Sequence, residues 1–274
     1  NIYISLHYIY ICMERLIIRK FGPIKELDIE IKPLTIFIGK SGSGKSVVLK
    51  TLSMFRWIYK RVNIRSYLTN AKVKNTRIRL STENLMRTSG LLEYLSDETY
   101  IEYIQDDYSI KLEKKKINPR KKIDNKNISI EKICFISDKR AVLSDFLFST
   151  RGVPTYYLQD TIDSFITAIN AIQEYHSENL DVNIKIEKNR IGAAKYRIFN
   201  TENKYSISFG NSSSGTQTSI PISVIVKYLS HIYSPQENML SSILKFLADN
   251  DKLTNFNTNL NMSDISRIRT HIII

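Results

Sequence analysis

The sequence predicts a mixed α/β fold, and three observations support this prediction. Several short segments alternate apolar and polar residues, which is typical of half-buried strands. Other segments repeat apolar residues with helical spacing, as at Val48, Leu52, Phe55 and Tyr59. A glycine-rich run from Gly39 to Ser46 separates an apolar strand pattern from that helical pattern. Strands and helices are therefore expected to alternate around a loop whose glycines permit close backbone approach.

Each element follows from its local pattern. The expected strands, in chain order, cover 16–22, 26–32, 34–39, a hairpin at 100–104 and 108–113, then 128–137, 182–188, 195–200 and 204–210. The turn Phe21–Ile24 joins the first two of them. The expected helices cover 47–60, a short stretch after Arg140, an amphipathic segment at 156–178, and a segment after Gln217 with Pro221 in its first turn. Residues 61–95 are polar and favour helix without a clear motif.

Composition excludes several classes of protein. The 274 residues are 42% hydrophobic and 24% charged, which excludes a wholly disordered chain. Nine glycines and six prolines exclude collagen-like and proline-rich scaffolds. Two cysteines cannot form a disulfide framework and fit a reducing cytoplasm. The four histidines show neither metal-ligand spacing nor a partner that would make them bases. A formal net charge of +13 favours polyanionic partners.

Both ends of the chain are unusual. Residues 1–12 are apolar and uncharged, but a bilayer-spanning helix needs about 20 residues. We interpret them as a non-native leader before a start at Met13; the alternative is an extra edge strand. At the other end the chain stops within an apolar run, His271 to Ile274, which has the pattern of the beginning of a strand.

The run Gly39–Ser46 reads GKSGSGKS and fits G-x-x-x-x-G-K-[ST] completely. Its glycines allow successive N–H groups to surround a phosphate, and the following helix N-terminus favours anions. The phosphate loop predicted here consists of Gly39, Lys40, Ser41, Gly42, Ser43, Gly44, Lys45 and Ser46. Lys45 is expected to neutralise the β- and γ-phosphates of ATP, and the Ser46 hydroxyl to ligate Mg²⁺. The alternative is a flexible surface turn.

A second serine-rich segment, residues 213–217 (SSGTQ), opens a predicted helix. We call it the signature segment. By itself it is an ordinary flexible turn. Its position after a β-hairpin and before a helix also allows its free N–H groups to receive an anion.

The pairing of GKSGSGKS with a later SSGTQ resembles the ATP-binding-cassette (ABC) type of ATPase head, in the SMC/RecF/OLD-like branch found in DNA repair and anti-phage defence. The opening FGPIKELDIEIKPLTIFIGKSGSGKS is similar to the start of that branch. The resemblance covers residues 13–274. It implies a P-loop NTPase with a mixed central sheet, a β-rich lobe at about 97–137, and a helical lobe with the signature segment at about 138–250. It further implies that Ser213, Ser214, Gly215 and Gln217 act in trans on ATP held by a second subunit.

The sequence departs from this family at Thr216, where many members carry Gly or Glu, and a second departure matters more. The Walker B motif, an apolar strand that ends in an acidic pair, is not visible between Gln217 and Ile274. Leu247-Ala248-Asp249 sits at an expected helix end and is rejected. The catalytic acids are therefore unknown, and we expect the chain to be incomplete at its C-terminus, just before them. Such a fragment is expected to bind nucleotide weakly at best and to turn over no ATP.

Two further features have open interpretations. The run 111–126 carries eight basic and two acidic residues, so it either contacts DNA or RNA phosphates or forms a solvated hairpin extension. Arg140 follows a strand end, near the Q-loop region of the resembling family. It either makes a functional contact there or belongs to a turn that Ser137 or Asp138 caps.

Together these features predict a cytoplasmic ATPase head that forms a homodimer around Mg-ATP. Closure of the dimer would gate an effector protein or a fused nuclease that acts on DNA, with no membrane partner. The alternatives are the nucleotide-binding subunit of an ABC transporter, and an ATP-sensing clamp without catalysis. A transporter subunit is disfavoured by the two-strand FGPI entry and by the long insertion at 61–132.

Overall fold

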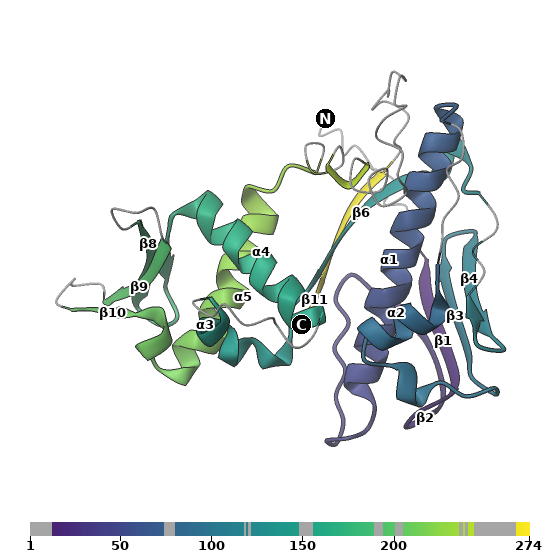
Figure 1. The fold of residues 1–274 in the computed structure, drawn as a ribbon, viewed down its shortest axis with the longest axis horizontal. Coiled ribbons are helices and arrows are strands. Elements are labelled where there is room, and N and C mark those ends of the chain that lie inside the picture. Colours follow the sequence, from purple (N-terminus) through teal and green to yellow (C-terminus); the bar gives the residue numbers. More distant parts are fainter. Residues whose placement is uncertain are drawn as a thin grey trace, which may run out of the picture. The chain divides into compact units, whose positions relative to one another are not determined.

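The computed structural model describes residues 13–73, 80–117, 119, 122–147, 156–188, 194–200, 205–235, 238, 241–243 and 267–274. The chain divides into two compact units (Figure 1). Unit 1 comprises residues 1–70 and 74–125, and unit 2 comprises residues 71–73 and 126–274. The fold is a mixed α/β arrangement with antiparallel sheets and helices, as the alternating sequence patterns predict.

Unit 1 is built on one antiparallel sheet with the strand order β2-β1-β3-β4-β5. Its strands are β1 (Glu14–Phe21), β2 (Ile24–Ile31), β3 (Tyr100–Gln105), β4 (Tyr108–Glu113) and β5 (Lys116–Ile117). Its helices are α1 (Lys45–Asn70), α2 (Thr82–Thr88) and the 3-10 helix η1 (Leu92–Tyr94). The expected strands at 16–22 and 26–32 and the hairpin at 100–113 are confirmed, because tight turns join alternating segments there.

Helix α1 packs on the sheet of unit 1. The ring of Phe55 lies 6.3 Å from that of Tyr103 on β3. On the same face, the Arg56 guanidinium donates to both carboxylate oxygens of Glu14 on β1, at 2.7 and 2.8 Å. The helix runs through the predicted 47–60 and continues to Asn70, so the polar stretch that follows is helical in its first part.

Unit 2 contains a four-stranded antiparallel sheet with the order β10-β9-β8-β7 and a separate parallel pair, β6 with β11. Its strands are β6 (Ser129–Phe135), β7 (Glu174–Ser177), β8 (Val182–Lys188), β9 (Ala194–Asn200), β10 (Ser206–Ser208) and β11 (Arg267–Ile273). Its main helices are η3 (Asp138–Val142), α3 (Leu143–Phe146), α4 (Tyr156–Ile172) and α5 (Ser214–His231). The described residues contain one parallel pair of strands, β6–β11, and the mixed central sheet that the resemblance implies stays a prediction.

The hydrophobic core of unit 2 packs helices α4 and α5 against the four-stranded sheet. Phe165 of α4 is fully buried and stacks on Phe209, with 5.9 Å between the ring centroids. The same phenylalanine lies 5.9 Å from the ring of Tyr196 on β9. Val224 of α5 is also fully buried in this cluster. The apolar residues of the pattern that predicted α4 therefore lie on the helix face that packs against the sheet and α5.

Three sequence predictions are wrong in detail. The helix predicted over 156–178 ends at Ile172, because Gln173 takes a left-handed φ of 67°, and the chain then forms β7. The predicted strand 34–39 has no strand partner among the described residues, and its Ile38 side chain is 93% exposed. Helix α5 begins at Ser214, so Pro221 lies inside the helix rather than in its first turn.

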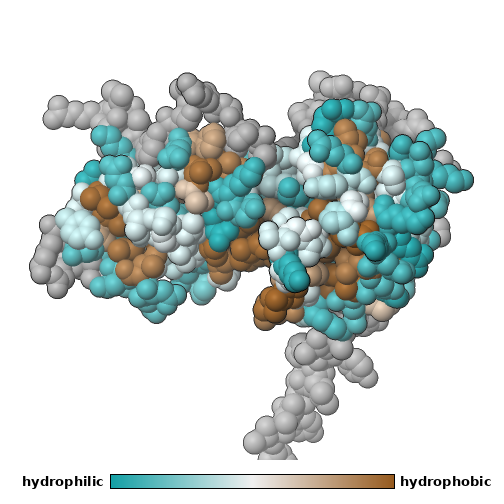
Figure 2. Space-filling view, turned by 90° about the horizontal axis from the view of Figure 1, so that it is seen from below, coloured by the Kyte–Doolittle hydropathy of each residue, from teal (hydrophilic) through white to brown (hydrophobic). Residues whose placement is uncertain are grey.

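Residues 1–12, interpreted above as a leader, the expected turn 201–203 and the segment 247–249 lie outside the described residues. Within the described part, no helix combines the length and the apolar character that a bilayer-spanning helix requires. The surface mixes polar and apolar areas (Figure 2). Several large apolar side chains are exposed, among them Leu34, Ile36, Ile38 and Ile274.

Candidate functional site

The phosphate loop has the backbone that its glycines predict. Gly42 and Gly44 adopt positive φ angles of 76° and 95°, where an L-residue is strained. The Ser43 N–H donates to the Lys40 carbonyl at 3.3 Å, and the Val48 N–H donates to the Gly44 carbonyl at 2.9 Å. The first bond closes the turn and the second begins α1. The first N–H groups of that helix have no carbonyl acceptor within the helix, so they are oriented to receive an anion.

The Lys45 side chain folds back over this loop. Its ammonium donates to the carbonyl oxygens of Gly39 and Lys40, both at 2.8 Å. The positive charge therefore lies over the loop backbone, next to the first turn of α1. Ser46, the predicted Mg²⁺ ligand, is exposed in the first turn of α1. The structure thus brings the predicted lysine, serine and loop backbone together at one helix end.

A neighbouring turn supports the loop, a contact that is not among the sequence predictions. A Cβ built on Gly44 would lie 3.1 Å from Cγ1 of Ile24 and 3.2 Å from Cγ of Pro23. Gly22, just before that proline, adopts a φ of 55°. The FGPI turn, residues 21–24, therefore packs directly against the phosphate loop. The signal that could have revealed this is the Gly-Pro pair, which marks a tight turn.

The signature segment forms the start of α5 in unit 2. Ser213 caps the helix, because its Oγ accepts a hydrogen bond from the Thr216 N–H at 3.2 Å. The Gln217 amide donates to the carbonyls of Gly210 and Ser212, at 2.9 Å each. Gln217 therefore anchors the segment through these two hydrogen bonds. Ser213, Ser214 and Gly215 are exposed to solvent.

Arg140 also contacts this helix. Its Nε donates to the Thr218 carbonyl at 3.1 Å, and its Nη1 donates to the Ser137 carbonyl at 3.2 Å. Ser137 caps η3 by accepting from the Lys139 N–H at 3.1 Å. Ser137 is therefore the cap, as one interpretation predicts, and Arg140 joins the turn after β6 to the signature helix. A functional contact of Arg140 stays a prediction.

Unit 2 contains one titratable cluster, around Glu131, that is not among the predicted sites. Glu131 on β6 is almost fully buried and accepts a hydrogen bond from Ser129 Oγ at 2.7 Å. Its other oxygen contacts His271 Nε2 on β11, and Arg269 lies 3.6 Å away. The prediction that the histidines have no partner is thus wrong for His271. The parallel pairing of β6 with β11 brings these residues together, and no local pattern reveals that pairing.

Described residues of the basic run 111–126 form ion pairs and a hydrogen bond within unit 1. Lys111 pairs with Glu102 at 3.3 Å, and Lys115 pairs with Asp97 at 3.0 Å. Farther along, the Ile123 N–H donates to Ser66 Oγ of α1 at 3.0 Å. Neighbouring carboxylates therefore neutralise part of its charge within unit 1. Arg120 and Lys121 lie outside the described residues, and a contact of the run with nucleic acid stays a prediction.

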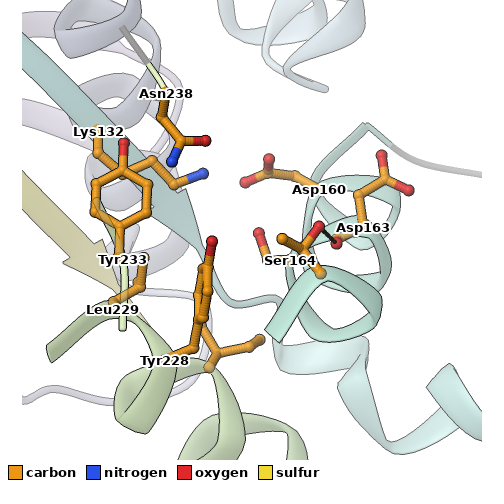
Figure 3. A pocket seen from close by; sticks show the side chains of 10 residues that line it. Lys132, Asp160, Asp163, Ser164, Tyr228, Leu229, Tyr233 and Asn238 are labelled. Atoms are coloured by element: carbon orange, nitrogen blue, oxygen red, sulfur yellow. Dashed lines mark hydrogen bonds between the residues drawn. The ribbon is translucent and has the colours of Figure 1, made fainter. Parts of the chain in front are cut away.

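A cavity of about 160 Å³ lies in unit 2 between β6, α4 and α5 (Figure 3). Lys132 and Asp160 point into it, and the Lys132 ammonium lies 6.0 Å from the centre of the Tyr233 ring. Burial, followed by the nearby Tyr228, raises the pKa of Tyr233 to about 12. Ligand pockets for small molecules measure about 300–1,000 Å³, so this cavity is too small for a nucleotide.

No group of three or more His, Cys, Asp or Glu side chains in the described ranges is placed to hold a metal ion. Searches against models of known protein families and against curated proteins found no match for this chain.

Proposed function

We propose that this chain is an ATP-binding head of the ABC type, in the SMC/RecF/OLD-like branch. The observation that carries the proposal is the phosphate loop: a complete motif, two glycines with positive φ, and the Lys45 ammonium folded over the loop at the start of α1. This combination offers N–H donors and one fixed cation to a nucleoside triphosphate, with Ser46 as the ligand for its Mg²⁺.

In this proposal two heads form a homodimer around Mg-ATP in the cytoplasm. Each nucleotide contacts the phosphate loop of one subunit and the exposed Ser214 and Gly215 of its partner. The dimer gates an effector protein or fused nuclease that acts on DNA, in anti-phage defence or DNA repair. Hydrolysis requires acidic residues that position water and Mg²⁺, and we assign none within this chain.

The test is the binding of Mg-ATP to the Lys45→Ala variant, measured by titration calorimetry. Loss of a charge-assisted contact to phosphate costs about 1.5–3 kcal/mol, so we expect affinity to fall about ten- to a hundredfold. Lys116→Ala is the matched control, because Lys116 is an exposed lysine of the same unit on β5. Circular dichroism verifies that both variants are folded. Equal ATP affinity in the two variants would refute the assignment of the loop.

A further inference from the structure

The cavity in unit 2 is lined by charged and polar side chains from three elements that are distant in sequence. Lys132 lies on β6, Asp160 on α4 and Tyr228 on α5. In Figure 3 the Lys132 ammonium and the Asp160 carboxylate point into the cavity from opposite sides. Three further residues add uncharged hydrogen-bonding groups to its wall: Ser164, Tyr233 and Asn238. The cavity therefore offers a positive end, a negative end and several neutral donors to one small ligand.

Lys132 occupies the face of β6 that packs against α4. Side chains alternate along a strand, so Lys132 shares a face with Cys134, which is fully buried and whose Sγ lies 3.6 Å from Ser164 Oγ of α4. Lys132 is itself half-buried, and its ammonium lies 6.0 Å from the centre of the Tyr233 ring. Within the described part of the chain, no carboxylate forms an ion pair with Lys132. Buried lysines are usually paired, so this half-buried ammonium is well placed to receive an anion.

Asp160 supplies the negative charge across the cavity. Its Oδ2 accepts a hydrogen bond from the Phe135 N–H at 3.1 Å, which joins α4 to the end of β6. A carboxylate has about four acceptor positions, so this bond does not prevent the group from accepting a donor of a ligand as well. Asp163 also lines the cavity, but it is exposed, and its Oδ1 accepts from the Gln159 amide at 2.7 Å. Asp160 is therefore the acid at the negative end of the cavity.

The turn after α5 holds the two tyrosines in place. The Tyr233 N–H donates to the Tyr228 carbonyl at 2.8 Å, and the two rings meet edge-on with 6.0 Å between their centroids. Burial raises the pKa of Tyr233 to about 12, so its hydroxyl remains protonated at neutral pH and can donate a hydrogen bond. The Asn238 amide donates to the Ser234 carbonyl at 2.9 Å, which fixes that side chain as well. Groups that are ordered before binding lose little entropy when a ligand arrives.

The volume and the charges of the cavity define the class of ligand. A protein cavity of about 150 Å³ accommodates a molecule of the size of benzene, so this one, at about 160 Å³, suits a ligand no larger than a small amino acid. A simple anion near Lys132 would be repelled by Asp160, and a simple amine near Asp160 would be repelled by Lys132. A zwitterion carries both charges and avoids both repulsions.

We propose that the cavity binds a short α-amino acid as its zwitterion. The ligand carboxylate contacts the Lys132 ammonium and accepts hydrogen bonds from the tyrosine hydroxyls, and the ligand ammonium contacts Asp160. The side chain of the ligand lies toward Ile225 and Leu229, the apolar residues of the wall. All of these residues belong to unit 2, whereas the phosphate loop belongs to unit 1. The inference therefore does not rest on the proposed function.

The experiment titrates glycine, L-alanine, L-serine and L-threonine into the 274-residue chain by calorimetry. Acetate and ethylammonium are the control ligands, because each carries only one of the two charges. Lys132→Met removes the positive end and Asp160→Asn removes the negative one, while asparagine keeps an oxygen for the Phe135 N–H. Lys227→Met, at an exposed lysine of α5, is the matched control. Circular dichroism verifies that the three variants are folded.

We expect the wild type to bind at least one of the four amino acids, and to bind acetate and ethylammonium about tenfold or more weakly than that amino acid. Loss of one charge-assisted contact should weaken amino-acid binding about ten- to a hundredfold in Lys132→Met and in Asp160→Asn, while Lys227→Met binds as the wild type does.

Three results would overturn the inference: no binding of any of the four amino acids, acetate binding as tight as amino-acid binding, or unchanged amino-acid binding in Asp160→Asn. The second result would make the cavity an anion site. The comparison of ligands in the wild type tests the inference even where a variant does not fold. None of these substitutions lies in the phosphate loop, so the binding of Mg-ATP decides the proposed function separately.

Discussion

The two positive-φ glycines of the phosphate loop offer a comparison whose magnitude follows from the structure. Replacement by alanine at either position forces a Cβ into a left-handed conformation, which costs about 1–2 kcal/mol. At Gly42 nothing lies within 4 Å of the added Cβ, so this backbone cost is the whole effect. At Gly44 the added Cβ lies 3.1 Å from Ile24 and 3.2 Å from Pro23. Relaxed carbon contacts are about 3.5–4.0 Å, so these neighbours must move.

The neighbours of Gly44 have little freedom to move. Ile24 is buried, and Pro23 has a rigid ring within a tight turn. Overpacking of this kind costs about 1–3 kcal/mol beyond the backbone term. We therefore expect Gly44→Ala to lower the free energy of unfolding of unit 1 by about 2–5 kcal/mol, and Gly42→Ala by about 1–2 kcal/mol.

The assay is urea unfolding followed by tryptophan fluorescence. Trp57 is the single tryptophan of the chain and lies on α1, which begins at the loop, so its emission reports on unit 1. The quantity to compare is the difference between the two variants, because both share the backbone cost. If Gly44→Ala is no less stable than Gly42→Ala, the loop does not pack against the FGPI turn as described.

Two further predictions concern the buried ion pair and the signature segment. Glu14→Gln leaves the Arg56 guanidinium, whose side chain is 8% exposed, without its carboxylate, so we expect unit 1 to lose about 3–5 kcal/mol of stability by the Trp57 assay. Asp28→Asn, in the exposed pair with Arg15, should leave the midpoint nearly unchanged, and an equal loss in both variants would contradict the prediction. Ser214→Arg places a bulky cation at the exposed start of α5, so we expect it to preserve ATP binding by one subunit and to abolish ATP-dependent dimers in light scattering with a non-hydrolysable analogue. Undiminished dimer formation would count against a role for Ser214 in trans.

Local signals predicted most of the strands and the phosphate loop. The hairpin β3–β4 has alternating residues on both sides of a polar turn, and Asp106 there takes a φ of 52°, which aspartate tolerates. In the loop, the positions of the glycines are enough to predict its positive φ angles. These features depend on residues close in sequence, so their physical cause can be read along the chain.

The remaining features depend on contacts that are distant in sequence. Gln173 ends α4 in a left-handed conformation, although neither glycine nor proline marks the position. The contact of Glu131 with His271 exists only because β6 pairs with β11 in parallel register. The contact of Tyr94 with Gly22 similarly joins η1 to the β1–β2 turn. Periodicity and propensity are local quantities, so they predict none of these pairs.

The phosphate loop and the signature segment share a construction but differ in charge. Both present exposed small residues at the start of a long helix, and in both a side chain from within the segment bonds to nearby carbonyls: Lys45 in the loop and Gln217 in the signature segment. The first of these side chains carries a positive charge and the second does not. The first turn of α5 contains no basic residue, and the neighbouring Arg140 guanidinium already donates to the carbonyls of Thr218 and Ser137. A triphosphate carries several negative charges, and such an end is too weakly positive to hold it by itself. The signature segment is therefore suited to add contacts to a nucleotide whose charge a phosphate loop with its lysine and Mg²⁺ has already neutralised. That division of roles is what the proposed dimer requires: each subunit contributes one site of each kind.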